Sequence, residues 1–113
     1  MNMQEYQAQA LQTAVYPDIG NNFIYPTLAL ADEAGEVAGK VKKLIRDKQK
    51  FTPAELNDDE RAELQKELGD VLWYVAALAQ ELGLSLDAVA AANLKKLASR
   101  QQRGVLGGSG DDR

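Results

Sequence analysis

The 113-residue chain contains neither cysteine nor histidine. Without cysteine it has no disulfide, no thiolate metal site and no thiol nucleophile. Without histidine it lacks the commonest general base and the commonest ligand of transition metals, which excludes Ser-His and Cys-His catalytic arrangements. Any chemistry must therefore come from carboxylates, lysines, arginines, hydroxyls and amides.

Long apolar runs and an excess of positive charge are also missing. No apolar run approaches the roughly 20 residues that span a membrane, and the polar first residues lack the pattern of a signal peptide. The net charge of -4 argues against a protein that binds nucleic acid by general attraction to phosphates. We therefore expect a cytoplasmic protein that binds neither a membrane nor nucleic acid.

Helix-forming residues dominate the chain, and no segment shows the alternation of a half-buried strand. Apolar residues recur at steps of three and four, which predicts helices over 3–15, 25–47, 58–82 and 86–101, the last capped by Ser85. Between the second and third helices, Thr52 and Glu55 predict a capped turn. The expected fold is all-α, an antiparallel four-helix bundle in one domain over 1–103. The glycine-rich segment 104–113 is expected to be a disordered tail.

Two acidic pairs lie on the two longest predicted helices with the same spacing. These four acids are Glu33 and Glu36 on one helix, and Glu67 and Asp70 on the next. Residues three apart share a helix face, so antiparallel packing can bring the four carboxylates together. Like charges repel when they are partly buried, and a bound cation relieves that repulsion. Ligands that are all oxygen favour Mg²⁺, with Mn²⁺ able to substitute.

Three glycines accompany these acids, although each costs a helix about 1 kcal/mol relative to alanine. We interpret Gly35, Gly39 and Gly69 as positions of close backbone approach, or as room for a ligand. A ferritin-like di-iron site is excluded because it needs Glu-x-x-His motifs. The alternative is that the acids are only solvated surface charge and that the chain is a non-catalytic helical interaction module.

The stretches LALADEAGEVAGKV and ELQKELGDVLWYVAALAQELGL resemble the MazG-like, all-α nucleotide pyrophosphohydrolases over residues 25–103. That family's signature is Glu-Glu-x-x-Glu, a spacer and then Glu-x-x-Asp. The four acids match it, whereas Asp32 replaces the first glutamate, which leaves the role of position 32 open. The resemblance implies an oligomeric enzyme, a homodimer or homotetramer, with sites at helix interfaces.

The resemblance further implies the reaction. A nucleoside triphosphate, NTP or dNTP, would be hydrolysed between its α- and β-phosphates to the monophosphate and pyrophosphate. The four acids would be the metal ligands and catalytic residues, and a metal-activated water would attack phosphorus. Such a water needs no histidine or cysteine, in agreement with the composition.

Candidate substrate-binding residues follow from spacing. Asn93, Lys96 and Arg100 lie at steps of three and four on the last helix, so they form one polar stripe. The cations of Lys96 and Arg100 suit the outer oxygens of a triphosphate, as the resemblance also implies, although a solvated basic face is the alternative.

Tyr74 lies one turn after Asp70 on the same face and is a candidate contact to the sugar or base, with a core position as the alternative. Asn22 and Tyr25 are candidates for the mouth of the pocket, whereas Trp73 is expected to pack in the core or between subunits.

Overall fold

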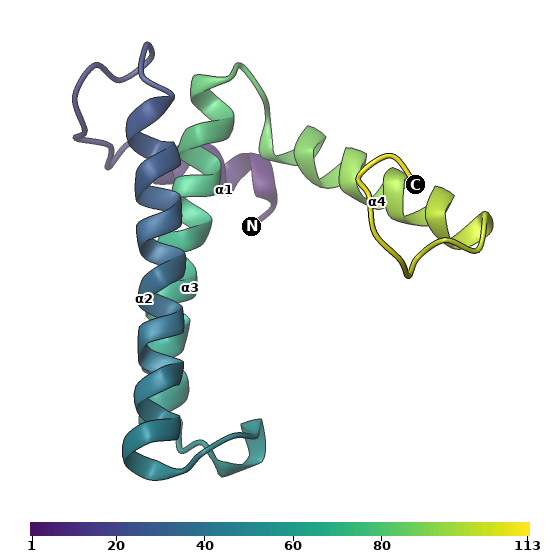
Figure 1. The fold of residues 1–113 in the computed structure, drawn as a ribbon. Coiled ribbons are helices and arrows are strands. Elements are labelled where there is room, and N and C mark those ends of the chain that lie inside the picture. Colours follow the sequence, from purple (N-terminus) through teal and green to yellow (C-terminus); the bar gives the residue numbers. More distant parts are fainter.

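The computed structural model describes all residues, 1–113, and contains helices but no strand. Its elements are α1 (Met3–Leu11), α2 (Ile24–Lys48), the 3₁₀ helix η1 (Pro53–Glu55), α3 (Asp58–Glu81) and α4 (Leu86–Gln102). In Figure 1, α2 and α3 form a long pair, α1 crosses behind the upper end of that pair, and α4 projects away from it. The all-α prediction is confirmed.

The helix ends follow from local capping. The side chain of Asn57 accepts a hydrogen bond from the backbone N–H of Glu60, and the Glu60 carboxylate accepts one from the N–H of Asn57, which starts α3. Ser85 caps α4 as predicted. The turn before it contains Gly83 at φ 71°, a left-handed conformation that favours glycine. Helix α1 ends at Leu11, four residues earlier than predicted.

The fourth helix does not join an antiparallel bundle, so this part of the predicted arrangement is wrong for the single chain. Helix α4 leaves α3 at 100° and contacts α1 and α3 but not α2. The turn is fixed by Gln7 of α1, which is buried. Its side-chain amide donates to the carbonyls of Ala76 (3.3 Å) and Leu84 (3.2 Å), and its Oε1 accepts from the N–H of Leu86 (3.0 Å). Helix α1 thus packs on both α3 and α4 at this turn.

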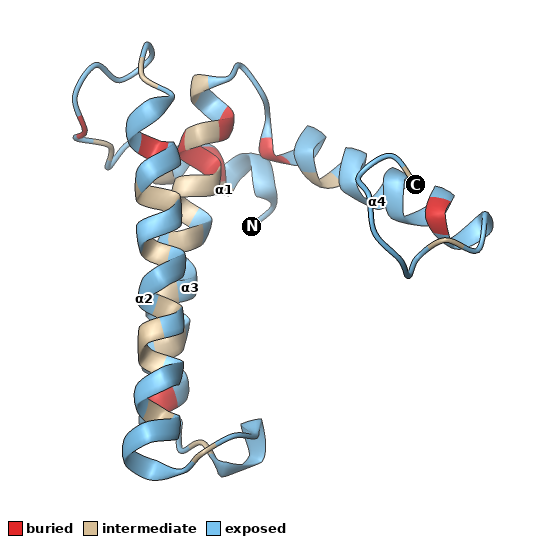
Figure 2. Ribbon diagram, in the orientation of Figure 1, coloured by how far each residue is buried: buried red, intermediate tan, exposed pale blue.

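The buried core is small and lies at this junction. It consists of Ala76, Ala79 and Leu86, with Tyr6 and Val75 packed against it. Figure 2 shows that buried residues gather near α1, whereas most of α2, α3 and α4 is exposed or half-buried.

Much apolar surface is left uncovered by the single chain. Although 45% of the residues are hydrophobic, only nine of 113 are buried. Leu28 on α2, Leu68 on α3 and Leu94 on α4 are 66%, 58% and 68% exposed. Exposed apolar surface that extends over several helices is typical of a surface that binds another protein.

Segment 104–113 turns back along the end of α4 in the structure (Figure 1). The guanidinium of Arg113 donates hydrogen bonds to the carbonyls of Val105, Leu106 and Gly110. The N–H of Val105 donates to the carbonyl of Arg100. The disorder expected for this tail stays a prediction.

No single helix is both long and apolar enough to cross a membrane. The bent pair of α3 and α4 satisfies that test only when the two helices are taken together. The cytoplasmic location stays a prediction.

The far end of the α2–α3 pair is held by one buried carboxylate. Glu60 is 8% exposed and accepts hydrogen bonds from the ammonium groups of Lys48 (2.8 Å) and Lys50 (2.6 Å). Together with the backbone N–H of Asn57, these two lysines lower the pKa of Glu60 from 4.5 to about 2. The ionised carboxylate therefore ties the loop after α2 to the start of α3.

A Glu60→Gln substitution should lower the melting temperature at pH 7, because the lysines lose their anionic partner. The pKa of Glu60 is lower in the folded state, so its contribution is complete above pH 4.5 and disappears as the pH falls towards 2. The melting temperatures of wild type and variant should therefore converge with acidification, as measured by circular dichroism. Asp59→Asn, which removes an exposed carboxylate from the same helical turn, is the matched control. An equal difference at pH 7 and at low pH would contradict this assignment.

Candidate metal centre

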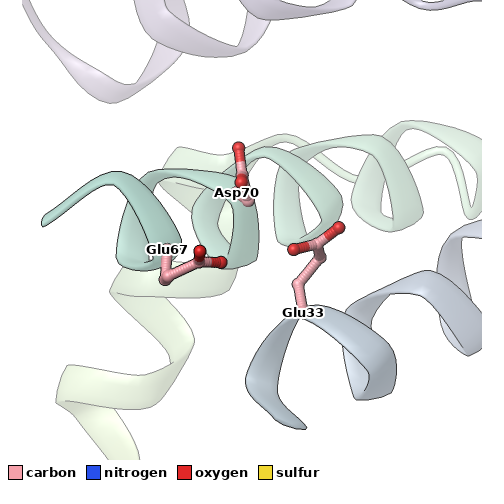
Figure 3. Close-up of side chains that lie close together, drawn as sticks. All are labelled: Glu33, Glu67 and Asp70. Atoms are coloured by element: carbon pink, nitrogen blue, oxygen red, sulfur yellow. The ribbon is translucent and has the colours of Figure 1, made fainter. Parts of the chain in front are cut away.

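Three of the four acids come together between α2 and α3. Glu33 of α2 and Glu67 of α3 extend towards each other, and Asp70 lies beside them on α3 (Figure 3). One carboxylate oxygen from each residue lies within 4.8 Å of the others. Glu33 and Glu67 are half-buried, whereas Asp70 is exposed. We call these three residues the acidic cluster.

Glu36 is not part of the acidic cluster and is exposed. At 3.6 residues per turn, a residue three positions after Glu33 is rotated from it by about 60° around the helix axis. This rotation turns Glu36 away from the α2–α3 contact, whereas Glu33 faces it. The structure therefore brings together three of the four predicted ligands, and the ligand role of Glu36 stays a prediction.

The acidic cluster is electrostatically unfavourable in the absence of a cation. Removal from water raises the pKa of Glu33, and the negative charges of Asp70, Asp32, Glu67 and Glu36 raise it further. Both effects penalise the ionised carboxylate. A divalent cation among these oxygens would oppose the effect of the neighbouring negative charges on the pKa of Glu33.

Lys40 provides the positive charge nearest to this site and was not foreseen from the sequence. Its ammonium lies 2.9 Å from a carboxylate oxygen of Glu63 and 2.9 Å from one of Glu67. Hydrogen bonds to Glu63 and then Glu67 raise the pKa of Lys40. Lys40 follows Glu33 by seven residues, which corresponds to a rotation of only about 20° around the helix axis. This spacing was the sequence signal that Lys40 lies on the same face of α2 as Glu33. Lys40 therefore holds Glu67 in place and leaves Glu33 and Asp70 without a cationic partner.

A cavity of about 480 Å³ opens beside the acidic cluster. Its lining includes Glu33 and Asp70 together with the aromatic residues Tyr16, Tyr25, Trp73 and Tyr74. Tyr74, predicted to share the face of Asp70, and Tyr25, a candidate for the mouth of the pocket, thus line one cavity with two of the acids. Trp73 was expected to serve only in packing, but it also lines this cavity. A volume in this range suits a small-molecule ligand.

The loop that forms one wall of this cavity is anchored by Glu81 of α3. The carboxylate of Glu81 accepts hydrogen bonds from the hydroxyl of Tyr16 (2.7 Å) and from the N–H groups of Gly20 (2.8 Å) and Asn22 (3.2 Å). Asn22 also accepts from the N–H of Tyr25 near the start of α2. Asn22 is therefore engaged in holding the loop and lies outside the cavity lining.

The candidate phosphate-binding residues of α4 are not beside the acidic cluster. Asn93 and Lys96 are exposed and line a different cavity, together with Leu84 and Val89. Arg100 is buried, and its guanidinium donates to the carbonyl of Asp111 in the tail. Because α4 does not contact α2, the single chain does not bring these side chains to Glu33.

The glycines near the acids do not mark close backbone approach, contrary to one part of our interpretation. A Cβ atom built at Gly35, Gly39 or Gly69 meets no neighbouring atom within 4 Å. The space around them is open, which leaves the second part of the interpretation, room for a ligand.

Comparison with known proteins places these features in a family. The family model of the MazG nucleotide pyrophosphohydrolase domain matches residues 25–105. The chain is also 48% identical to the "Gene 37 protein" of Mycobacterium phage L5, over an alignment of 118 positions that covers the whole of both proteins. No solved structure matches significantly. The family model identifies the class, a nucleotide pyrophosphohydrolase domain, and the structure of the chain is all-helical. The chain belongs to the MazG nucleotide pyrophosphohydrolase family.

Magnesium should raise the melting temperature of the wild-type protein, because a cation held by the acidic cluster would favour the folded state, in which the three carboxylates converge. At a free Mg²⁺ concentration 100 times the Kd, the stabilisation is about 2.7 kcal/mol. Glu33→Gln should remove this response, and it should leave the metal-free protein at least as stable because one repelling charge is lost. Differential scanning fluorimetry with Mg²⁺ or Mn²⁺ measures both effects.

Asp87→Asn, which removes an exposed carboxylate from α4, is the control and should keep the full magnesium response. Two results would rule out this site. One is a wild-type melting temperature that neither metal ion changes, and the other is a Glu33→Gln variant whose melting temperature rises as much as that of the wild type.

Proposed function

We propose that the protein is a Mg²⁺-dependent hydrolase that cleaves a nucleoside triphosphate, NTP or dNTP, into the monophosphate and pyrophosphate. Family membership establishes the general class, a hydrolase of nucleotide pyrophosphate bonds. The observation that supports the proposal most directly is the convergence of Glu33, Glu67 and Asp70 beside a cavity of ligand size. The particular bond, nucleotide and metal ion are our inference.

The donor set of the acidic cluster fits Mg²⁺. It offers carboxylate oxygens and neither nitrogen nor sulfur, which disfavours zinc and copper. When bound in such a site, Mg²⁺ neutralises phosphate charge and lowers the pKa of a coordinated water. Glu33, Glu67 and Asp70 would hold the ion, with Glu36 as a predicted fourth ligand. Lys40 keeps the Glu67 carboxylate at the α2–α3 contact.

The proposed enzyme is a homodimer or homotetramer. Two observations support a second copy: the exposed apolar residues of α2, α3 and α4, and the distance of the α4 stripe from the acids of its own chain. In this arrangement α4 of one copy brings Asn93 and Lys96 to the acidic cluster of another. Arg100 contributes positive charge to the same helix, although its guanidinium is engaged with the tail.

Hydrolysis should produce the monophosphate and intact pyrophosphate from the first turnovers. Anion-exchange chromatography of a reaction with Mg²⁺ separates these products from a diphosphate and orthophosphate. Asp70→Asn should lower kcat by about 100-fold or more, because it removes a ligand of the metal ion that would neutralise charge at the reacting phosphate. Early accumulation of diphosphate would mean that the γ-phosphorus is attacked. If a panel of NTPs and dNTPs is not consumed at all, the non-catalytic interaction module becomes the better explanation.

Lys96→Ala should lower kcat/KM for a triphosphate by about tenfold or more, the loss expected for one charge-assisted hydrogen bond. If Lys96 acts on the acids of another subunit, mixing this variant with inactive Asp70→Asn should restore activity. Random exchange in a dimer makes about a quarter of all sites intact. The measurement is activity before and after the two variants are mixed and allowed to exchange. Unchanged kcat/KM for Lys96→Ala would show that the stripe is only a solvated face, and no recovery would place Lys96 in its own subunit's site.

A further inference from the structure

The cavity beside the acidic cluster has two chemically different ends. Carboxylates of Glu33 and Asp70 form one end, and four aromatic rings gather at the other. The rings of Tyr16 and Tyr25 stack with centroids 5.4 Å apart and an interplanar angle of 5°. Trp73 and Tyr74 meet edge to face, with centroids 4.8 Å apart. Tyr25 is 42% exposed and offers its ring to a ligand.

Two polar groups at the aromatic end, the hydroxyl of Tyr16 and the indole N–H of Trp73, are already engaged within the protein. The hydroxyl of Tyr16 donates to Glu81 (2.7 Å), and burial with this hydrogen bond raises the pKa of Tyr16 to about 12. The indole N–H of Trp73 is shared between the carbonyl of Ala10 (3.0 Å) and the hydroxyl oxygen of Thr13 (3.1 Å). The Thr13 hydroxyl in turn donates to the same carbonyl (2.7 Å). At Tyr16 and Trp73 the aromatic end therefore presents ring faces and edges rather than free donors and acceptors.

We propose that this aromatic end holds the base of the nucleotide by stacking on Tyr25, and that it selects only weakly among the four bases. This inference rests on the proposed function for the identity of the ligand. Glu33 follows Tyr25 by eight residues on α2, which is about 12 Å along the helix axis. A base at Tyr25 is thus separated from the acidic cluster by a distance that the sugar and first phosphate can bridge.

Weak selection follows from the chemistry of the cavity. Every base has an aromatic face, so stacking tolerates all four. Strong discrimination arises where a site must form hydrogen bonds to particular groups of the ligand, because the wrong ligand then leaves buried polar atoms unpaired. Tyr16, Trp73 and Thr13 satisfy their polar atoms without a ligand, so a change of base leaves nothing unpaired on them.

Trp73 is the only tryptophan of the chain and reports directly on this cavity. Titration of the wild-type protein with AMP, GMP, CMP and UMP, in the presence of Mg²⁺, should change its fluorescence for each nucleotide. The four Kd values should agree within about tenfold, which is the range expected without base-specific hydrogen bonds. Pyrophosphate, which has no base, should leave the fluorescence unchanged. A preference above 100-fold for one base would overturn the weak selection.

Two variants test the role of the ring itself. Tyr25→Ala should weaken binding of all four monophosphates by at least about fivefold, the loss of one stacking contact. Tyr25→Phe keeps the ring and should retain wild-type affinity. Phe51→Ala removes an aromatic residue that is exposed on the loop after α2, outside the cavity, and should also bind as the wild type does.

The two proposals fail in different ways. Nucleotides that change Trp73 fluorescence in a Tyr25-dependent manner, but are never hydrolysed, would support the base site and contradict the proposed enzyme. Pyrophosphate release by a protein whose Trp73 does not respond to monophosphates, or whose Tyr25→Ala variant keeps wild-type KM and affinity, would overturn the base site and leave the enzyme intact.

Discussion

The repulsion among three carboxylates at one helix contact is the constraint on which the rest of the structure depends. Glu33, Glu67 and Asp70 face one another because α2 and α3 pack along their length. Contacts beyond the acidic cluster hold that packing. The lysine pair around Glu60 ties one end of the two helices, and the hydrogen bonds to Glu81 tie the loop at the other. The protein thus keeps an unfavourable charge arrangement in place by means of favourable ones on either side.

The helices were predictable because their signals are local. The bounds of α2 and α4 differ from those predicted by one residue, and the capping groups at Ser85 and Thr52 are where the sequence placed them. The direction of α4 was not predictable. It depends on Gln7, whose hydrogen bonds reach Leu84 and Leu86 across more than 70 residues of chain, and no spacing of nearby residues encodes such a contact. The early end of α1 was missed because apolar periodicity continues past it.

For the candidate site, spacing predicted which acids share a helix face and that Tyr74 lies on the face of Asp70, but it did not predict the rotation of the helices. Two residues three apart share a broad face, yet only the structure shows that Glu33 points to α3 and Glu36 does not. The role of Lys40 was not predictable from its own helix, because its partners Glu63 and Glu67 lie on α3. The aromatic end of the cavity includes Tyr16, which belongs to a loop with no periodicity. Its place is fixed by Glu81, 65 residues further along the chain.

The turn around Leu84 sets the direction in which α4 extends. The 17 residues of α4 extend about 25 Å, so a change of about 10° at the turn moves the far end by roughly 4 Å. Gln7 forms hydrogen bonds on both sides of that turn, to Ala76 of α3 and to Leu86 of α4. Helix α1 contributes no residue to the acidic cluster, yet its Gln7 links α3 to α4 and so helps to set the direction of α4 and of Asn93 and Lys96 on it. A buried amide on the shortest α-helix thus helps to orient a helix that lies more than 70 residues further along the chain.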